Sequence, residues 1–188
     1  MQAGTDKAAK VGAGSTHLIL VDTGGTFNKC YQPVDGTLVV GQGARAAREI
    51  LRSAEDNLAI DWLEPVCKDS LEMTDEDRET IVQTVREAAD RHPDASVLVV
   101  HGTDTMVLTG EALARSVPEH CVVLTGAMRP YEIDPVEASL NLGLALGFVQ
   151  GCPRPGVYLA MSGLVRPLGG LEKDRSRGCF RPSGLTSI

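Results

Sequence analysis

The feature that most constrains the fold is a regular succession of short apolar runs and segments with helical spacing. The apolar runs cover residues 18–21, 65–67, 97–100, 122–124 and 157–161, and each has the length of a buried strand. Helical spacing occurs between them, over residues 44–57, 74–92, 105–116 and 135–151. This alternation predicts an α/β fold with a mostly parallel sheet and helices on both faces, a three-layer flavodoxin-like or Rossmann-like domain. A β-hairpin near the N-terminus is predicted from the arm at residues 37–40.

Length and composition predict one globular domain. The chain has 188 residues, of which 43% are hydrophobic and 23% charged. Residues 1–15 are small and polar, which is typical of a flexible lead-in. We therefore expect a single domain over residues 16–188, without a second C-terminal domain.

Charge and cysteine usage exclude several classes of function. The net charge is −7 and no basic run is present, so nucleic acid and anionic membranes are not expected partners. The five cysteines show neither C-x-x-C nor zinc-site spacing, and His92 and His120 are predicted to be surface residues outside any cluster. No metal, no cofactor and a cytoplasmic location with reduced thiols are the expectations.

Four polar segments follow predicted strands, at residues 23–26, 69–73, 101–105 and 126–130. Ligands of open parallel sheets bind beyond the carboxyl ends of the strands, so these segments are expected to meet at one edge. Taken singly, each segment has a structural explanation as a tight turn, a polar loop or a helix cap.

The residue types in these segments fit a zwitterionic amino acid. Thr26 and Thr103 stand next to glycines, where backbone N–H groups can point at a substrate oxygen. Asp104 with Glu72 would hold an ammonium group, and Ser70 a carboxylate. A hydroxyl nucleophile needs a base, and because no histidine is suitably placed, the candidates are Tyr31 and Lys173.

Three ordered motifs resemble the bacterial-type L-asparaginase family. They are the TGGT sequence at 23–26, HGTDTM at 101–106, and GAMRP at 126–130 followed by Asn141. The resemblance extends from about residue 18 to Lys173, and the chain looks like the short, single-domain subgroup of the family.

The resemblance implies hydrolysis of L-asparagine to L-aspartate and ammonia through a threonine nucleophile and an acyl-enzyme, without a cofactor. By position, Thr26 matches the nucleophile, Tyr31 its paired tyrosine, and Thr103, Asp104 and Lys173 the second catalytic set. The positions matched to substrate binding are Gly25, Asp69, Ser70, Glu72, Gly102 and Ala127. Leu71 and Glu137 depart from the family pattern, which commonly has glutamine and aspartate there. The resemblance also implies a homodimer or homotetramer.

Other interpretations stay open at this level. Thr103 can be the nucleophile, with Lys173 as its base. A non-catalytic member would bind an amino acid without turnover, because fold and motif do not establish catalysis. The sequence DTGGT at residues 22–26 also resembles the ATP phosphate loop of sugar kinases and hydantoinases, although that fold is far longer.

Overall fold

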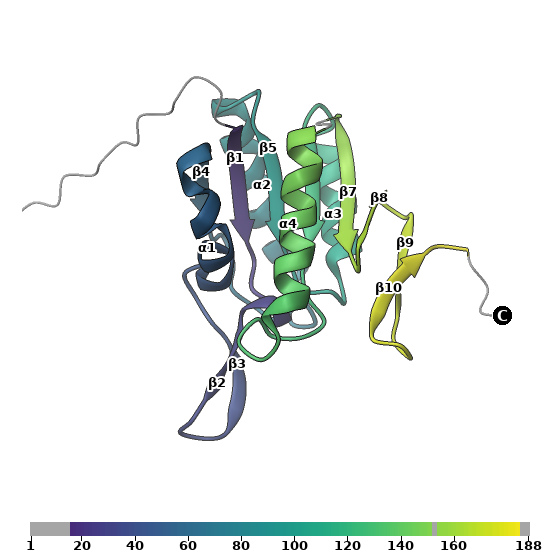
Figure 1. Cartoon of the computed structure of the whole chain (residues 1–188). Coiled ribbons are helices and arrows are strands. Elements are labelled where there is room, and N and C mark those ends of the chain that lie inside the picture. The colour runs from purple at the N-terminus through teal and green to yellow at the C-terminus, as the bar shows by residue number, and fades with distance from the viewer. Residues whose placement is uncertain (1–15, 152–153, 185–188) are drawn as a thin grey trace, which may run out of the picture.

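The computed structural model describes residues 16–151 and 154–184, so the predicted lead-in lies outside the described residues. A six-stranded sheet forms the centre of the molecule (Figure 1). The order of its strands is β4-β1-β5-β6-β7-β8. Its strands are β1 (Thr16–Asp22), β4 (Leu58–Leu63), β5 (Ser96–Val100), β6 (Cys121–Thr125), β7 (Gly156–Met161) and β8 (Leu164–Pro167). Neighbouring strands are parallel except β8, which is antiparallel to β7. The predicted α/β class is confirmed.

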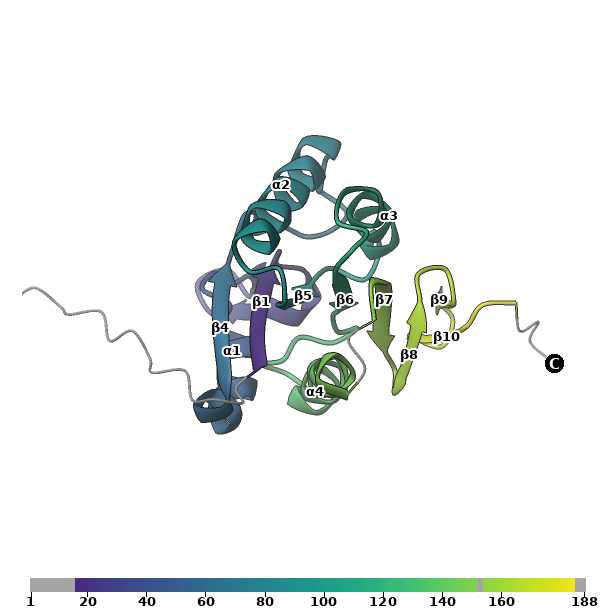
Figure 2. The same ribbon diagram turned by 90° about the horizontal axis from the view of Figure 1, so that it is seen from above.

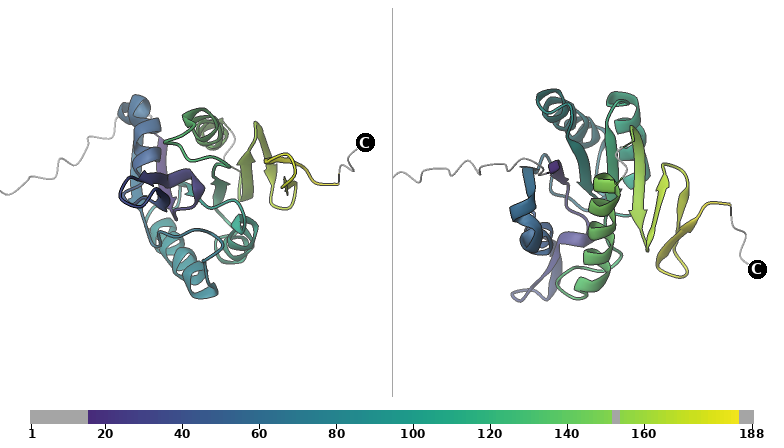
Figure 3. Two further views of the ribbon diagram at one scale, coloured as in Figure 1. Left: turned by 90° about the horizontal axis from the view of Figure 1, so that it is seen from below. Right: turned by 45° about the horizontal axis from the view of Figure 1, so that its top comes forward.

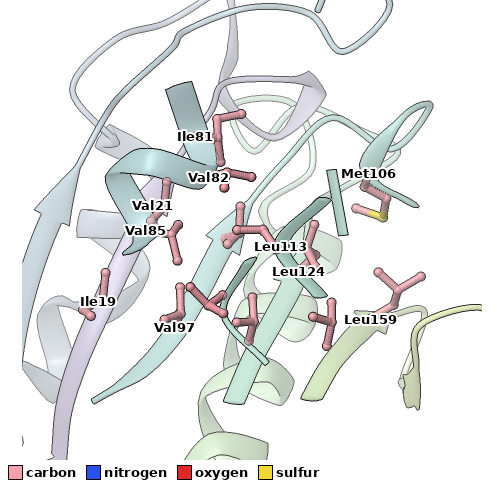
Figure 4. Packing of buried hydrophobic residues seen from close by; sticks show 14 of the residues in the cluster. Ile19, Val21, Ile81, Val82, Val85, Val97, Met106, Leu113, Leu124 and Leu159 are labelled. Atoms are coloured by element: carbon pink, nitrogen blue, oxygen red, sulfur yellow. The ribbon is translucent and has the colours of Figure 1, made fainter. Parts of the chain in front are cut away.

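Helices cover both faces of the sheet (Figure 2). The helices α2 (Asp75–Arg91) and α3 (Met106–Ser116) pack on one face, and α1 (Arg45–Leu51) and α4 (Pro135–Gly151) on the other. Figure 4 shows the first of these cores, in which Ile81, Val85 and Leu113 from the helices meet Val21 and Val97 from the strands. No described helix combines the length and apolar character that a bilayer crossing requires.

Local sequence signals explain where the helices begin. Thr74 and Asp77 form a reciprocal capping box at the start of α2, as the sequence predicts. Before α4, the Asp134 carboxylate accepts a hydrogen bond from the Val136 N–H, with Pro135 in the first helical position. Strands β1 and β5 are buried along almost their whole length, because helices cover both of their faces.

Strand order places a crevice between β1 and β5. From β1 the chain first adds β4 on one side and later β5 on the other, so the direction of winding reverses between them. Such a reversal of strand order, beyond the carboxyl ends of the strands, is the usual ligand site of this architecture. Figure 3 shows this lower edge of the sheet, with the hairpin of β2 (Lys29–Gln32) and β3 (Thr37–Val40) beneath it.

Three predicted elements need correction. Residues 65–67 were expected to form a strand, but the strand is β4, at Leu58–Leu63, whose apolar run is interrupted by Asp61. The predicted helix over 44–57 is α1 followed by a 3-10 helix at Arg52–Asn57. The glycine-rich segment after β7 forms β8 and a hairpin of β9 (Leu171–Asp174) and β10 (Cys179–Pro182).

Two buried titratable side chains hold the loops at this edge. Asp22 Oδ1 accepts hydrogen bonds from the Gly24 N–H at 2.9 Å and Asn28 Nδ2 at 2.7 Å, which fixes the turn after β1. Burial raises the pKa of Asp22 from 3.8 to about 6, against the lowering effect of these hydrogen bonds. Burial lowers the pKa of His101 from 6.5 to about 4, so this imidazole is neutral at pH 7.

The two groups give the stability opposite dependences on pH. Because the folded-state pKa of Asp22 is raised, its contribution is complete below about pH 3.8 and is lost as the pH rises through about 6. The folded-state pKa of His101 is lowered, so its contribution is present above pH 6.5 and is lost as the pH falls through about 4. Between about pH 4 and pH 6 the two effects on stability partly cancel.

Asp22→Asn is expected to remove the contribution of Asp22 to the pH dependence of stability. Asparagine keeps the oxygen that accepts the hydrogen bonds but carries no buried charge. The free energy of unfolding of the variant, relative to wild type, should then rise by roughly 3 kcal/mol between pH 4 and pH 7. Urea unfolding at half-unit pH steps measures this difference. Asp56→Asn, at an exposed carboxylate, is the control. Parallel pH profiles for Asp22→Asn and wild type would show that the Asp22 carboxyl group titrates normally.

Candidate active site

The loop after β1 is locked against the segment before α2. Thr23 O accepts a hydrogen bond from the Lys68 N–H, and the Gly25 N–H donates to Lys68 O at 2.8 Å. Gly24 has a φ of +93°, and a Cβ there would lie 2.7 Å from the Lys68 backbone. Only glycine fits this position, so the TGGT motif is required by the close approach of two backbones.

The loops after β1 and β5 also approach each other closely at glycines. A Cβ on Gly25 would lie 2.5 Å from Gly102 Cα, and one on Gly102 would lie 2.5 Å from Ser70 Oγ. The loop after β6 joins them, since a Cβ on Gly126 would lie 2.4 Å from His101 O. The four polar segments therefore converge on one edge of the sheet, as expected from the sequence.

A charged network lies within this edge. Lys173, on β9, donates from Nζ to Thr103 Oγ1 at 2.8 Å and to Asp104 Oδ1 at 2.9 Å. Arg175 also contacts Asp104 Oδ1, at 2.7 Å. Burial alone would raise the pKa of Asp104, but the hydrogen bonds and positive charges of Lys173 and Arg175 outweigh it and hold the pKa below 3.8. The structure thus brings together Thr103, Asp104 and Lys173.

Thr26 and Tyr31, in contrast, are not joined by a hydrogen bond in the described structure. Thr26 begins a short 3-10 helix, Thr26–Asn28, and its hydroxyl makes no hydrogen bond to any residue that the structure describes. Tyr31 is 56% exposed on the hairpin, and its hydroxyl lies near Gly36 at the hairpin turn. The Tyr31 backbone N–H donates to Glu132 Oε1 at 2.9 Å.

The expected substrate-binding residues have different environments. Ser70 is buried against Gly102, whereas Glu72 is exposed. Asp69 forms an ion pair with Lys29 at 2.6 Å, and this hydrogen bond holds the pKa of Asp69 below its usual value. Ala127 is buried in the core beside α4. A backbone contact, not its methyl group, is therefore what Ala127 can offer a ligand.

Two residues whose role the sequence does not indicate, Asn141 and Glu137, hold the loop after β6. Asn141 Nδ2 donates to Gly126 O at 2.9 Å, and Asn141 Oδ1 accepts from the Ser162 N–H at 3.0 Å. The Glu137 carboxylate accepts hydrogen bonds from the backbone N–H groups of Met128, at 2.9 Å, and Arg129. The departure at Glu137 thus preserves an anion that fixes the loop. A polar residue on the buried face of an apolar helix was the available signal for Asn141.

A cavity of about 300 Å³ lies beside this edge but does not include the two threonines. It is enclosed by the hairpin, α1 and the loop before α4, with Phe27, Lys29, Arg45 and Tyr131 among its lining residues. The convergent hydroxyl and charged groups, rather than this cavity, define the candidate active site.

The arrangement is suited to attack on an uncharged carbonyl. Thr26 and Thr103 offer hydroxyls on loops that touch, and the Lys173 ammonium supplies positive charge beside Thr103. Such groups can hold an oxygen on which negative charge develops.

Comparison with known proteins identifies the family of this chain. The family model for the N-terminal domain of asparaginase matches residues 17–175. The thermostable L-asparaginase of Thermococcus kodakarensis superposes with a TM-score of 0.76 at 28% identity, covering 91% of this chain and 52% of its own. No curated protein sequence matches the chain significantly.

Two further structures share the fold at lower identity. The probable cytoplasmic L-asparaginase of Campylobacter jejuni superposes with a TM-score of 0.74 at 23% identity, covering 89% of this chain and 52% of its own. L-asparaginase I of Vibrio cholerae O1 superposes with a TM-score of 0.71 at 24% identity, covering 92% of this chain and 52% of its own. The chain spans about half the length of each of these structures. Since the family model matches most of its residues, the chain belongs to the asparaginase family and carries the family's N-terminal domain.

Proposed function

We propose that the chain is an amidohydrolase that converts L-asparagine to L-aspartate and ammonia. The observation that carries this proposal is the hydrogen-bonded set of Thr103, Asp104 and Lys173, on a loop whose Gly102 touches Gly25. Thr103 and Asp104 follow β5, at the reversal of strand order, and belong to the segment that resembles the family's second motif. Family membership and the likeness to L-asparaginases support the substrate.

In the proposed reaction, Thr26 Oγ1 attacks the side-chain amide carbon of asparagine. The threonine proton passes through a base to the amide nitrogen, ammonia leaves, and an ester links Thr26 to the aspartyl group. Thr103 and backbone N–H groups of the glycine loops stabilise the oxyanion. Water then hydrolyses the ester and restores the threonine hydroxyl. Asp104 and Glu72 hold the ammonium group of the substrate, and Ser70 its carboxylate.

Tyr31 is the base that we propose for Thr26, and this role requires movement of the hairpin. Tyr31 lies on β2, three residues beyond the 3-10 helix that begins at Thr26, and is exposed in this structure. We propose that the hairpin moves about its ends at Asn28 and Gly41 to place the phenol near Thr26. Loop closure of this kind excludes water and completes catalytic sites in many enzymes.

The alternative assignment makes Thr103 the nucleophile. It is favoured by one observation, the 2.8 Å contact with Lys173, which Thr26 lacks. Lys173 Nζ, however, already donates hydrogen bonds to both Thr103 Oγ1 and Asp104 Oδ1, which is the arrangement of a donor and not of a base. We therefore assign Lys173 to charge stabilisation and retain Thr26 as the nucleophile.

Replacing Thr26 by alanine is expected to lower ammonia release from L-asparagine by at least about a thousandfold, because the attacking oxygen is removed. The measurement is steady-state ammonia release from L-asparagine, with L-glutamine in parallel. Thr80→Ala, at an exposed threonine of α2, is the matched control. A well-folded wild type that binds amino acids but releases no ammonia would leave the non-catalytic binder as the function.

The nucleophile is identified directly by trapping the acyl-enzyme. Acid quench during turnover of labelled L-asparagine, followed by peptide mass spectrometry, should place an added aspartyl group on the peptide that contains Thr26. An aspartyl group on Thr103 instead would reverse the assignment while keeping the amidohydrolase.

Lys173→Met is expected to lower kcat by about 10²–10⁴-fold, because the charge beside Thr103 is lost when the oxyanion forms. Arg175→Gln is the matched comparison, since Arg175 contacts Asp104 but lies outside the contact with Thr103. Its effect should be smaller and fall mainly on KM. Equal losses of kcat in the two variants would contradict this assignment. They would show that catalysis depends on positive charge beside Asp104 and not on the contact of Lys173 with Thr103.

The remaining features of the proposed function follow from family membership. We infer a cytoplasmic enzyme that assembles as a homodimer or homotetramer, acts on a small molecule, and has neither nucleic acid nor membrane as a partner. The net charge of −7 supports the last two points. Sedimentation equilibrium should give a mass of two or four chains, and a monomer at micromolar concentration would overturn the assembly.

A further inference from the structure

Two histidines and an aspartate meet at the end of the sheet opposite the candidate active site. His17 lies near the start of β1, Asp61 lies on the edge strand β4, and His92 ends α2. Asp61 Oδ2 lies 3.3 Å from His17 Nε2 and 3.2 Å from His92 Nε2. The two imidazole rings lie with their centroids 4.1 Å apart, tilted by 58°. This corrects the expectation that His92 stands outside any cluster.

Two of the three spacings between these atoms fit a tetrahedral metal site. Zinc binds histidine nitrogen and carboxylate oxygen at about 2.0–2.1 Å, so two ligands of a tetrahedral ion lie about 3.3 Å apart. The two nitrogen–oxygen distances, 3.3 and 3.2 Å, are close to this value. One ligand atom from each of the three residues lies within 4.8 Å of the other two.

The donors, two imidazoles and one carboxylate, are also ligand types that zinc takes in proteins. One carboxylate oxygen faces two imidazole nitrogens, so it can satisfy them by hydrogen bonds only if both carry protons there. A zinc ion binds both nitrogens in their neutral, unprotonated form and shares the carboxylate charge. The side chains are 32–37% exposed, which leaves a path for the ion and room for a water ligand.

We propose that His17, Asp61 and His92 bind one zinc ion, with water completing the coordination. The ion would join the edge strand β4, the neighbouring strand β1 and the end of α2, three elements that come from distant parts of the sequence. This site is independent of the proposed amidohydrolase activity, because the threonines follow the carboxyl ends of β1 and β5. Its role is structural.

Metal binding is tested on the full chain after treatment with a chelator. Calorimetric titration with zinc chloride should show one site per chain, and cobalt(II) should give the intense visible absorption of a tetrahedral ion. At a free zinc concentration a hundredfold above Kd, Tm should rise by about 5–10 °C. His92→Gln and Asp61→Asn should each lose the cobalt spectrum and the shift in Tm.

Two controls separate this site from other donors. His120→Gln removes a histidine outside the cluster, and Asp94→Asn removes an exposed carboxylate two residues from His92. Both should bind zinc as the wild type does. His17→Gln provides a second test if either cluster variant fails to fold without metal. Zinc binding that persists in the cluster variants would place the ion on cysteines, and no binding by wild type would leave a hydrogen-bonded cluster only. Either result overturns the proposal.

Discussion

The close approach of the backbones at Gly25 and Gly102 is the constraint on which the geometry of the site depends. A Cβ on Gly25 would lie 2.5 Å from Gly102 Cα, so no side chain fits between the two loops. The loops leave β1 and β5, which are buried between two helical layers and cannot shift independently. The hydroxyls of Thr26 and Thr103, each one residue beyond a contacting glycine, are therefore positioned by the packed sheet. Rigid supporting strands are what a preorganised site requires.

Two cations of different exposure contact Asp104. Its carboxylate oxygen binds both Lys173, whose side chain is 15% exposed, and Arg175, whose side chain is 71% exposed. An exposed ion pair contributes little stability, because water solvates both partners when they separate. In the proposed function, a substrate ammonium would therefore displace Arg175 from Asp104 at small cost. Lys173 would stay in place, since its removal would leave a half-buried carboxylate and the Thr103 hydroxyl without their shared donor.

Local patterns in the sequence predicted the parts of the fold that depend on local physics. The capping box at Thr74 and Asp77 and the convergence of the glycine-containing loops both appear in the structure. Strand β4 could not be found this way, because it is an edge strand whose apolar pattern Asp61 interrupts. The cluster around Asp61 was missed for a related reason: His17 and Asp61 are 44 residues apart, and only the pairing of β1 with β4 joins them. The environment of Tyr31 depends on the position of a hairpin, which no local pattern determines.

Exposure also separates two sides of the candidate site. Thr103, Ser70 and Gly102 are buried by contacts within the described chain. Tyr31 and Leu71, in contrast, are 56% and 71% exposed, although both belong to segments that match the family's site. Buried segments are held by their neighbours, whereas exposed side chains keep their rotamer freedom. The inner side of the candidate site is therefore positioned by this fold. For the proposed reaction, the outer side would be completed by closure of the hairpin or by a second surface that packs over it.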